Sequence, residues 1–290
     1  MTRAVILGSQ GFVGGHLSAH LAEVGVPVLG LSSRDVDLTA PSAVDALAGR
    51  LKPDDSLVFV SALTPDKGRD IATMMRNLRM AEYVCAAVAK APCAHVVYVS
   101  SDAVYVDDAN PVRETSCASP SSFHGTMHLV RERMLLETTR AAKVPLAILR
   151  PSLLYGPGDT HNGYGPNRFV RTALADRKIT LFGGGEEKRD HVFIDDVSRI
   201  IELVLRRRSG GVLNIGTGNA VSFREVADVI ASTIGGVAIE HSPRANPITH
   251  RHFDTTAIAS AFPAFRFTPI AGGLETTLSA DQSGAARAAD

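Results

Sequence analysis

Short apolar runs alternate with longer stretches in which apolar residues recur every three or four positions through the first half of the chain. The first pattern predicts buried β-strands, and the second predicts amphipathic helices. Apolar strands that alternate with helices form βαβ units. We therefore predict an α/β fold, a Rossmann-type doubly wound parallel sheet with a smaller C-terminal α/β substrate lobe. The predicted strands are 3–8, 26–31, 56–61, 95–101 and 145–150, and the predicted helices begin near Phe12 or span 42–51, 71–91 and 125–143.

The second half of the chain is less regular, and glycine and proline recur in a loop over 155–167. Ser222 and Glu225 form a capping box that predicts a helix over 222–234. The end of the chain is rich in Ala, Ser and Asp, which predicts a disordered tail. Further predicted elements are the helices 168–175 and 195–207 and the strands 179–182 and 211–215. We expect a dinucleotide-binding domain over 1–165 with a strand and a helix returning from about 188–216, a mainly substrate-binding lobe over 166–278, and a disordered tail over 279–290.

The first predicted strand ends at a turn that contains Gly8, Gly11 and Gly14. In a dinucleotide site the first such glycine permits a tight turn, the second leaves room for a pyrophosphate, and the third lets the helix pack on the strand. The start of the following helix offers N–H groups and a partial positive charge to phosphates. This stretch predicts a bound dinucleotide, and the alternative is a glycine-rich turn without a ligand.

The end of the second predicted strand bears on which dinucleotide is bound. A site that selects the free 2′-hydroxyl usually has a carboxylate there, whereas this chain has Ser32, Ser33 and Arg34. Two hydroxyls and a guanidinium suit a 2′-phosphate, so the sequence favours NADP over NAD. The alternative is an ordinary polar loop. Asp37 and Leu38, which follow, are expected at the adenine end of the cofactor.

Composition narrows the classes of partner. The chain of 290 residues has 30 basic and 30 acidic residues, which argues against binding bulk nucleic acid or an anionic membrane surface. Its three cysteines, Cys85, Cys93 and Cys117, form no CxxC pair, so we expect a reduced, cytoplasmic setting and no disulfide or metal framework. Neither a signal peptide nor an apolar run of transmembrane length is visible.

Several motifs follow the glycine turn. Asn77 lies in the long predicted helix, and Arg251 and Asp254 lie near the end of the chain. The other motifs are SSDAVY at 100–105, RPSLLYGPG at 150–158, RDHVFIDDV at 189–197 and NIG at 214–216. With these motifs the chain resembles the extended short-chain dehydrogenase/reductase family, in its nucleotide-sugar epimerase, dehydratase and reductase branch, over residues 3–278. The stretch 34–38 is most similar to the phosphodinucleotide-dependent keto-sugar reductases of that family.

The resemblance implies a catalytic set of a serine or threonine, a tyrosine and a lysine, with the last two four residues apart on one helical face. It places the serine at Ser101. Gly125 and Glu132 fix the register, so that His124 takes the tyrosine position and His128 the lysine position; the chain contains no Tyr-x-x-x-Lys. Because an imidazole titrates near 6.5, His124 can serve as the acid/base at neutral pH, with His128 at the nicotinamide ribose.

The two histidines leave alternatives open. One alternative is that the site has lost its chemistry and only binds a nucleotide. The other is that the histidines form a metal pair, although no third ligand is evident nearby. Asp102 is a candidate second acid, as in the dehydratases of the family. Ala103, however, stands where those dehydratases have a glutamate.

The function implied by the resemblance is an NAD(P)-dependent epimerase or keto-reductase that acts on a nucleotide-activated sugar. A homodimer through the helices 71–91 and 125–143 is likewise implied. The alternatives are a catalytically silent dinucleotide-binding or redox-sensing module, and an enzyme for a non-nucleotide sugar or carbonyl substrate. Expected substrate contacts are Tyr155, Asn167, Phe182, Arg189 and Arg251, and expected cofactor contacts are Gly8, Gln10, Gly11, Phe12, Val13, Gly14, Ser32, Ser33, Arg34, Asp37, Leu38, Ser61, Ala62, Leu63, Asn77, Ser100, His128 and Pro151.

Overall fold

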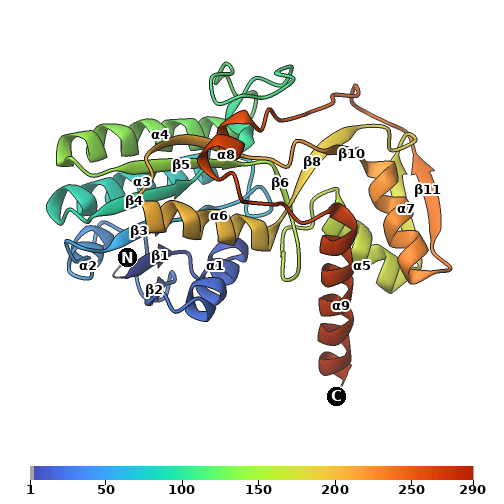
Figure 1. Ribbon diagram of the computed structural model, residues 1–290, viewed down its shortest axis with the longest axis horizontal. Helices are drawn as coiled ribbons and strands as arrows, with labels where there is room; N and C mark the ends of the chain where they lie inside the picture. The colour runs from blue at the N-terminus through green and yellow to red at the C-terminus, as the bar shows by residue number, and fades with distance from the viewer. Residues whose placement is uncertain (1–2, 290) are drawn as a thin grey trace. The chain divides into compact units, whose positions relative to one another are not determined.

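The computed structural model describes residues 3–289, and its contacts divide the chain into two compact units (Figure 1). The chain leaves the first unit after Pro151 and returns at Val197, so the first boundary lies earlier than the predicted residue 165, and the segment 188–196 belongs to the second unit. Unit 1 comprises Met1–Asp107, Glu114–Pro151 and Val197–Ile215, and unit 2 comprises Asp108–Arg113, Ser152–Asp196 and Gly216–Asp290.

Unit 1 is built on a six-stranded sheet in the order β2-β1-β3-β4-β5-β9, in which every neighbouring pair is parallel. Strands β1, β3, β4 and β5 are buried at every residue, which explains their continuous apolar runs. The predicted fold class is confirmed. The strands are β1 (Ala4–Leu7), β2 (Val28–Leu31), β3 (Ser56–Phe59), β4 (His95–Val99), β5 (Leu146–Pro151) and β9 (Gly211–Ile215).

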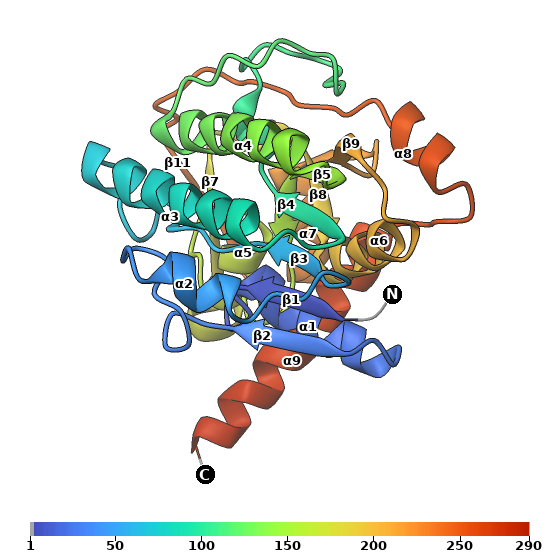
Figure 2. The ribbon, with the colours of Figure 1, turned by 90° about the vertical axis from the view of Figure 1, so that its left-hand side faces the viewer.

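Helices cover both faces of this sheet (Figure 2). One face carries three helices whose apolar side chains, among them Leu47, Val84 and Leu135, pack on strand residues such as Leu57 and Val96. Each such buried side chain stabilises the unit by ~1.5–3 kcal/mol. Helices α1 and α6 lie on the other face. The helices are α1 (Phe12–Glu23), α2 (Ala43–Ala48), α3 (Ile71–Lys90), α4 (Phe123–Ala142) and α6 (Ile194–Arg207), with a 3-10 turn η1 (Asp102–Val104).

Side-chain caps determine where the helices begin. The Asp70 carboxylate accepts a hydrogen bond from the Thr73 N–H at 2.7 Å at the start of α3. The Ser122 hydroxyl accepts from the Gly125 N–H at 3.1 Å at the start of α4. Each cap satisfies a backbone donor that the first helical turn leaves unpaired. The cap at Ser122 therefore holds the first turn of α4, which contains His124, in a defined position.

Strand β9 forms one edge of the sheet. Its first residues, Gly211 and Val212, are exposed. Further along the strand, the Asn214 N–H donates to Oε1 of Glu114 at 2.8 Å. A side chain rather than another strand thus pairs with this backbone group.

Unit 2 contains two small sheets and four helices among the described residues. The predicted capping box of Ser222 and Glu225 is present. The segment 108–113 joins this unit through a bridge between Val112 and Phe253. The elements are β6 (Leu153–Tyr155), β8 (Lys188–Phe193) and β10 (Ala220–Ser222) in one sheet, β7 (Lys178–Phe182) and β11 (Ala238–Ser242) in the other, and α5 (Pro166–Asp176), α7 (Phe223–Ile234), α8 (Thr256–Ala261) and α9 (Ile270–Ala289).

The C-terminal end departs from the expectation drawn from its composition. Residues 279–289 continue α9 rather than forming a disordered tail, and Asp290 lies outside the described residues. The helix is anchored at its start, where Leu274 and Leu278 are buried. In the described part of the chain, no helix combines the length and the apolar character that crossing a membrane requires.

Candidate functional site

The turn between β1 and α1 has the backbone that its glycines predict. Gly8 has a φ of +93°, which strains any residue with a side chain. A Cβ on Gly14 would lie 2.1 Å from the Gly8 carbonyl oxygen, so α1 packs on the turn at a distance that only glycine permits. Gly11 is the N-cap of α1 and supplies no side-chain cap. Gln10 and Gly11 are exposed, so this helix start is accessible to an anion such as a phosphate.

The carboxyl ends of three neighbouring strands meet at this turn. A Cβ on Gly8 would lie 2.7 Å from the Ser61 hydroxyl after β3, and a Cβ on Gly30 of β2 would lie 2.8 Å from Cβ of Ser9. Strand β2 lies on one side of β1, and β3, the next strand in the chain, lies on the other side. Ligands bind at such a switch point in doubly wound sheets.

The segment after β2 is arranged differently from the expectation. The Ser32 hydroxyl donates to Oδ2 of Asp35 at 2.7 Å, and the Ser32 N–H donates to the same oxygen at 2.8 Å. These hydrogen bonds lower the pKa of the Asp35 carboxyl. Ser32 is therefore occupied within the protein, whereas Ser33 and Arg34 are exposed.

Two other residues expected at the adenine end are also held by the protein itself. The Asp37 carboxylate accepts hydrogen bonds from the N–H and the hydroxyl of Thr39. The Leu38 side chain is buried in the apolar core. Leu38 thus contributes to the core of unit 1, and its contact with adenine stays a prediction.

Asn77 was expected to contact the cofactor, but its side chain is fully used inside unit 1. Its amide nitrogen donates to the carbonyls of Leu63 and Thr73, and its Oδ1 accepts from the Leu63 N–H and from Arg131. An amide offers two donor hydrogens and two acceptor lone pairs, and all four are satisfied. Asn77 therefore positions the loop that contains Ser61, Ala62 and Leu63.

The end of β4 carries Ser100 and Ser101, whose hydroxyls have different partners. The Ser100 hydroxyl donates to Oε1 of Glu132 at 2.5 Å, and this hydrogen bond joins the end of β4 to α4. The Ser101 hydroxyl accepts from the Ala103 N–H at 3.1 Å and lies 3.4 Å from Oδ1 of Asp102. Ser101 and Asp102 are half-buried, which leaves them accessible in part.

A buried polar network under Ser100 was not foreseen from the sequence. Glu132 binds Arg150 through two hydrogen bonds of 2.9 and 2.5 Å. Arg150 also donates to the Tyr105 hydroxyl at 2.8 Å, and that hydroxyl donates to Oδ1 of Asn214. Charged groups this deeply buried require such pairing. The network joins β5 to α4 and to the segment after β4, and it thereby holds Ser100 and its neighbour Ser101 in position.

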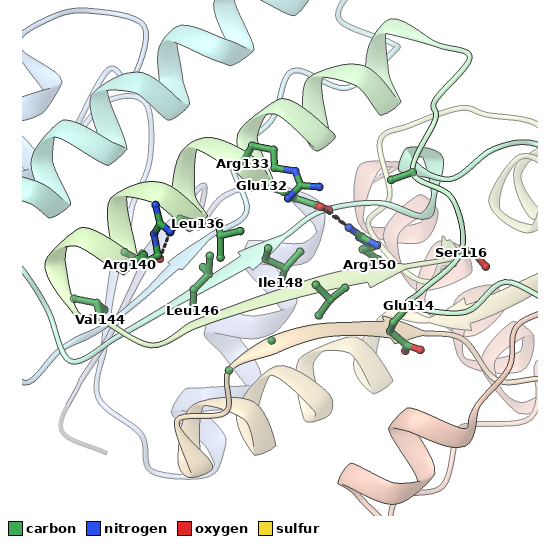
Figure 3. A pocket seen from close by; sticks show the side chains of 15 residues that line it. Glu114, Ser116, Glu132, Arg133, Leu136, Arg140, Val144, Leu146, Ile148 and Arg150 are labelled. Carbon is green, nitrogen blue, oxygen red and sulfur yellow. Dashed lines mark hydrogen bonds and ion pairs between the residues drawn. The ribbon is translucent and has the colours of Figure 1, made fainter.

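A cavity of about 640 Å³ lies beside this network, between α4 and the strands β5 and β9 (Figure 3). Leu136, Leu146 and Ile148 give it an apolar lining, and the Glu132–Arg150 ion pair lies at one end. None of the residues expected to contact cofactor or substrate lines this cavity.

The start of α4 lies directly against η1. A Cβ on Gly125 would be 2.0 Å from the Ala103 carbonyl oxygen, so only glycine permits this approach. Since His124 precedes Gly125 and Asp102 precedes Ala103, the contact brings the two candidate acids to the same end of the sheet. His124 is half-buried.

His128 lies one turn further along α4 and is buried, with a relative exposure of 4%. Its ring centroid lies 4.6 Å from that of His124, at an interplanar angle of 82°. Its Nδ1 lies 2.7 Å from the hydroxyl oxygen of Tyr98, a buried residue of β4. Burial, followed by the charges of His124 and Arg131, holds the pKa of His128 well below its ordinary value. His128 is therefore neutral, unlike the lysine that the family resemblance implies at this position.

Two of the expected substrate contacts are enclosed within unit 2. Tyr155 is fully buried, and burial raises the pKa of its hydroxyl. The Asn167 side chain pairs with both backbone groups of Gly156 and donates to the Asp159 carboxylate at 2.8 Å. These residues shape the loop after β6, and their contact with a substrate stays a prediction.

The other three candidates also lie in unit 2, where Phe182 is exposed and the two arginines are half-buried. Phe182 is exposed, and its ring packs on that of Tyr164 at a centroid distance of 4.6 Å. Arg189 and Arg251 lie on segments joined by a hydrogen bond from the Arg251 N–H to the Lys188 carbonyl at 3.1 Å. The backbone thus brings the two arginines together.

An acidic residue, Glu187, pairs with one of these arginines. Its carboxylate accepts a hydrogen bond from Arg189 and another from Arg244, the latter at 3.2 Å. Arg189 also donates to Thr249. A carboxylate bridging two guanidinium groups uses the same donors that would hold a phosphate. Arg244 was not foreseen, because it lies 57 residues from Glu187 in an irregular segment.

Comparisons with known proteins agree with this fold. MoeE5, solved in complex with UDP-glucose and NAD, is 26% identical, with a TM-score of 0.84 and coverage of 98% of this chain and 99% of that one. "Putative UDP-glucose 4-epimerase" of Methanocaldococcus jannaschii is 30% identical over 165 residues, which are 55% of this chain and 54% of that protein. "Uncharacterized UDP-glucose epimerase YtcB" of Bacillus subtilis (strain 168) is 29% identical over 147 residues, 50% of this chain and 46% of that protein.

The chain thus spans about half the length of the curated relatives that it matches. The model of the family described as "NAD dependent epimerase/dehydratase family" matches residues 4–216. This range extends from the first strand of the sheet through its last strand, β9, and into the following turn. The chain therefore belongs to the NAD dependent epimerase/dehydratase family.

Proposed function

We propose that the protein is a cytoplasmic, NAD(P)-dependent epimerase or keto-reductase that acts on a nucleotide-activated sugar, with His124 as its acid/base. The observation that carries the proposal is the contact of Gly125 with Ala103. It holds His124 against the turn that bears Ser101 and Asp102, in the same unit as the glycine turn. The UDP-sugars named with MoeE5 and the curated relatives support the substrate class.

The residues of unit 1 suit a bound dinucleotide. The space over Gly8, Gly11 and Gly14 is kept by the absence of side chains, and the exposed start of α1 suits the pyrophosphate. A bound nicotinamide would supply hydride transfer, from a carbon that carries a hydroxyl to the cofactor or from the cofactor to a carbonyl carbon. His124 takes the proton from that hydroxyl oxygen in the first direction and gives it back in the second. Ser101 donates a hydrogen bond to the same oxygen.

We assign the choice of cofactor to Arg34 and favour NADP. Arg34 and Ser33 are exposed at the end of β2 and suit a 2′-phosphate, whereas the Ser32 hydroxyl is already paired with Asp35. Arg34→Ala is expected to weaken NADP binding about tenfold and leave NAD binding unchanged, as measured by titration calorimetry. Equal losses for both cofactors would refute this assignment.

In unit 2 we assign the diphosphate of the substrate to Arg189 and Arg251, and its base to the exposed face of Phe182. Planar guanidinium groups bind phosphate oxygens in pairs. Arg189→Ala is expected to abolish UDP binding, whereas Arg177→Ala, at the C-terminal end of α5, leaves it intact. Turnover of a non-nucleotide sugar or carbonyl compound by Arg189→Ala would favour a different substrate class.

The central experiment measures C4 epimerisation and NAD(P)H formation with a panel of UDP- and dTDP-sugars. A positioned proton-transfer group contributes about 10²–10⁴-fold, so His124→Ala should lose at least a hundredfold in kcat. His20→Ala is the control, because His20 pairs with Glu202 on the other face of the sheet. Tight binding of cofactor and nucleotide sugar without any turnover would instead establish a catalytically silent module.

We further propose a homodimer through α3 and α4. The apolar residues that these helices expose include Ile71, Met75, Phe123 and Val130, and exposed apolar patches mark interaction surfaces. Met75→Glu should shift the protein from dimer to monomer in light scattering coupled to gel filtration. A monomeric unmodified protein would contradict the proposal.

A further inference from the structure

The replacement of the expected lysine by His128 removes a cation from this part of unit 1. Because His128 is buried and neutral, its role depends on which ring nitrogen carries the single proton. The structure contains an indication of that choice. Nδ1 of His128 lies 2.7 Å from the Tyr98 hydroxyl, so one of these two groups donates to the other.

The neighbouring cation decides the direction of this hydrogen bond. Arg131 is fully buried and donates to the carbonyls of Asn77 and Ser61. Its guanidinium also acts on the Tyr98 hydroxyl and opposes part of the rise by which burial brings the pKa of Tyr98 to about 12. The positive charge of the guanidinium attracts the lone pairs of the Tyr98 oxygen and repels the phenolic hydrogen, which therefore points away from Arg131. Nδ1 of His128 is the acceptor that the structure offers.

We propose that Tyr98 is a positioning residue for His128. Its hydroxyl donates to Nδ1, and Arg131 fixes the direction of that hydroxyl. His128 is thereby held as the neutral tautomer with its proton on Nε2. Nε2–H is then a permanent donor, in place of the lysine, for a ribose hydroxyl of the cofactor. This inference rests on the proposed function only for the identity of the group that receives the Nε2–H bond.

The arrangement also separates the roles of the two histidines. The groups that face His128 are Tyr98 from β4 and His124 and Arg131 from α4. Protonating His128 would place its charge beside that of Arg131 and would remove the acceptor of the Tyr98 hydroxyl. Protonation of His128 is therefore disfavoured, so His128 acts as a hydrogen-bond donor and not as a proton carrier.

The test reads the tautomer in the ligand-free protein. Long-range ¹H–¹⁵N correlation spectra of ¹⁵N-labelled protein distinguish a protonated ring nitrogen from an unprotonated one, and His128→Gln identifies the signals of His128. We expect a protonated Nε2 and an unprotonated Nδ1 from pH 8 to pH 5. A protonated Nδ1 in the unmodified protein would overturn the proposal, whatever the variants do.

Tyr98→Phe keeps the ring and removes only the hydroxyl. Its loss should raise the pH at which His128 becomes protonated by about one unit, which is tenfold in the protonation constant. Tyr83→Phe on α3 is the matched control and should leave the midpoint unchanged. If Tyr98→Phe has the same His128 protonation midpoint and the same tautomer as the unmodified protein, the proposal is refuted. If this variant fails to fold, the spectrum of the unmodified protein decides.

A second readout measures the link to the cofactor. Tyr98→Phe should weaken NADPH binding about tenfold, and Tyr83→Phe should not. If the predicted tautomer is found but neither dinucleotide binds the unmodified protein, the proposed function fails while the role of Tyr98 stands. If the unmodified protein binds NADPH and has the other tautomer, the inference fails and the proposed function stands.

Discussion

Replacing either of two adjacent glycines in α1 by alanine should change the thermal stability of the protein, in opposite directions for the two positions. A Cβ on Gly14 would lie 2.1 Å from the Gly8 carbonyl oxygen and 3.0 Å from Cα of Ser9, both of them backbone atoms. To restore a separation of 3.0 Å, the helix and the turn must move apart by about 0.9 Å, the difference between 3.0 and 2.1 Å. A Cβ on Gly15 would lie 3.7 Å from the Ser9 carbonyl oxygen, an ordinary contact.

Overpacking of this kind costs ~1–3 kcal/mol, so Gly14→Ala should lower the thermal midpoint by about 2–8 °C. Gly15→Ala should raise it by about 1–4 °C, because alanine is ~0.5–1 kcal/mol better than glycine within a helix. The displaced start of α1 in Gly14→Ala should also weaken NAD(P)H binding at least tenfold. Differential scanning fluorimetry and cofactor titration measure the two effects. Equal midpoints for the two variants would refute the assigned packing.

Three further predictions concern charged and titratable groups. Glu187→Gln should tighten UDP binding about tenfold in titration calorimetry, because it frees donors of Arg189 from an internal carboxylate, whereas Glu240→Gln, which affects an exposed carboxylate paired with Lys178, should change it less than twofold. Glu132→Gln should destabilise unit 1 by ~3–5 kcal/mol in urea unfolding, because it leaves the buried Arg150 charge unpaired; a loss below about 1 kcal/mol would contradict the pairing. Burial holds the pKa of His191 at about 3, so the unfolded chain binds the extra proton, and stability should fall as the pH is lowered from about 6.5 toward 3. His191→Phe should flatten that pH dependence, and an unchanged slope would show that other groups cause it.

The sequence was a good guide where structure depends on local pattern. The apolar runs at Val5 and Val58 predicted buried strands, and Ser222 with Glu225 predicted the start of α7. The glycine turn was predicted in the same way, since the spacing of Gly8 and Gly14 reflects a contact between adjacent elements. Such features depend on residues close together in the chain.

The side-chain partners could not be predicted, because they join residues that are distant in the chain. Asn77 had the residue type of a cofactor contact, but its partner Arg131 lies 54 positions away. Tyr155 belongs to a motif associated with the substrate, yet the packing of α9 encloses it. The pairing of Tyr98 with His128 depends on the register between β4 and α4. Only the folded chain shows which polar groups are already satisfied and which are accessible to a ligand.

The position of Glu114 at the edge strand β9 has a consequence for self-association. An edge strand with unpaired N–H groups can recruit a strand from another molecule and begin aggregation. The Glu114 carboxylate takes the hydrogen bond of the Asn214 N–H and brings a negative charge that would repel the same group on an approaching copy. The Glu114 side chain thus closes this position of β9 to pairing with a strand of another copy.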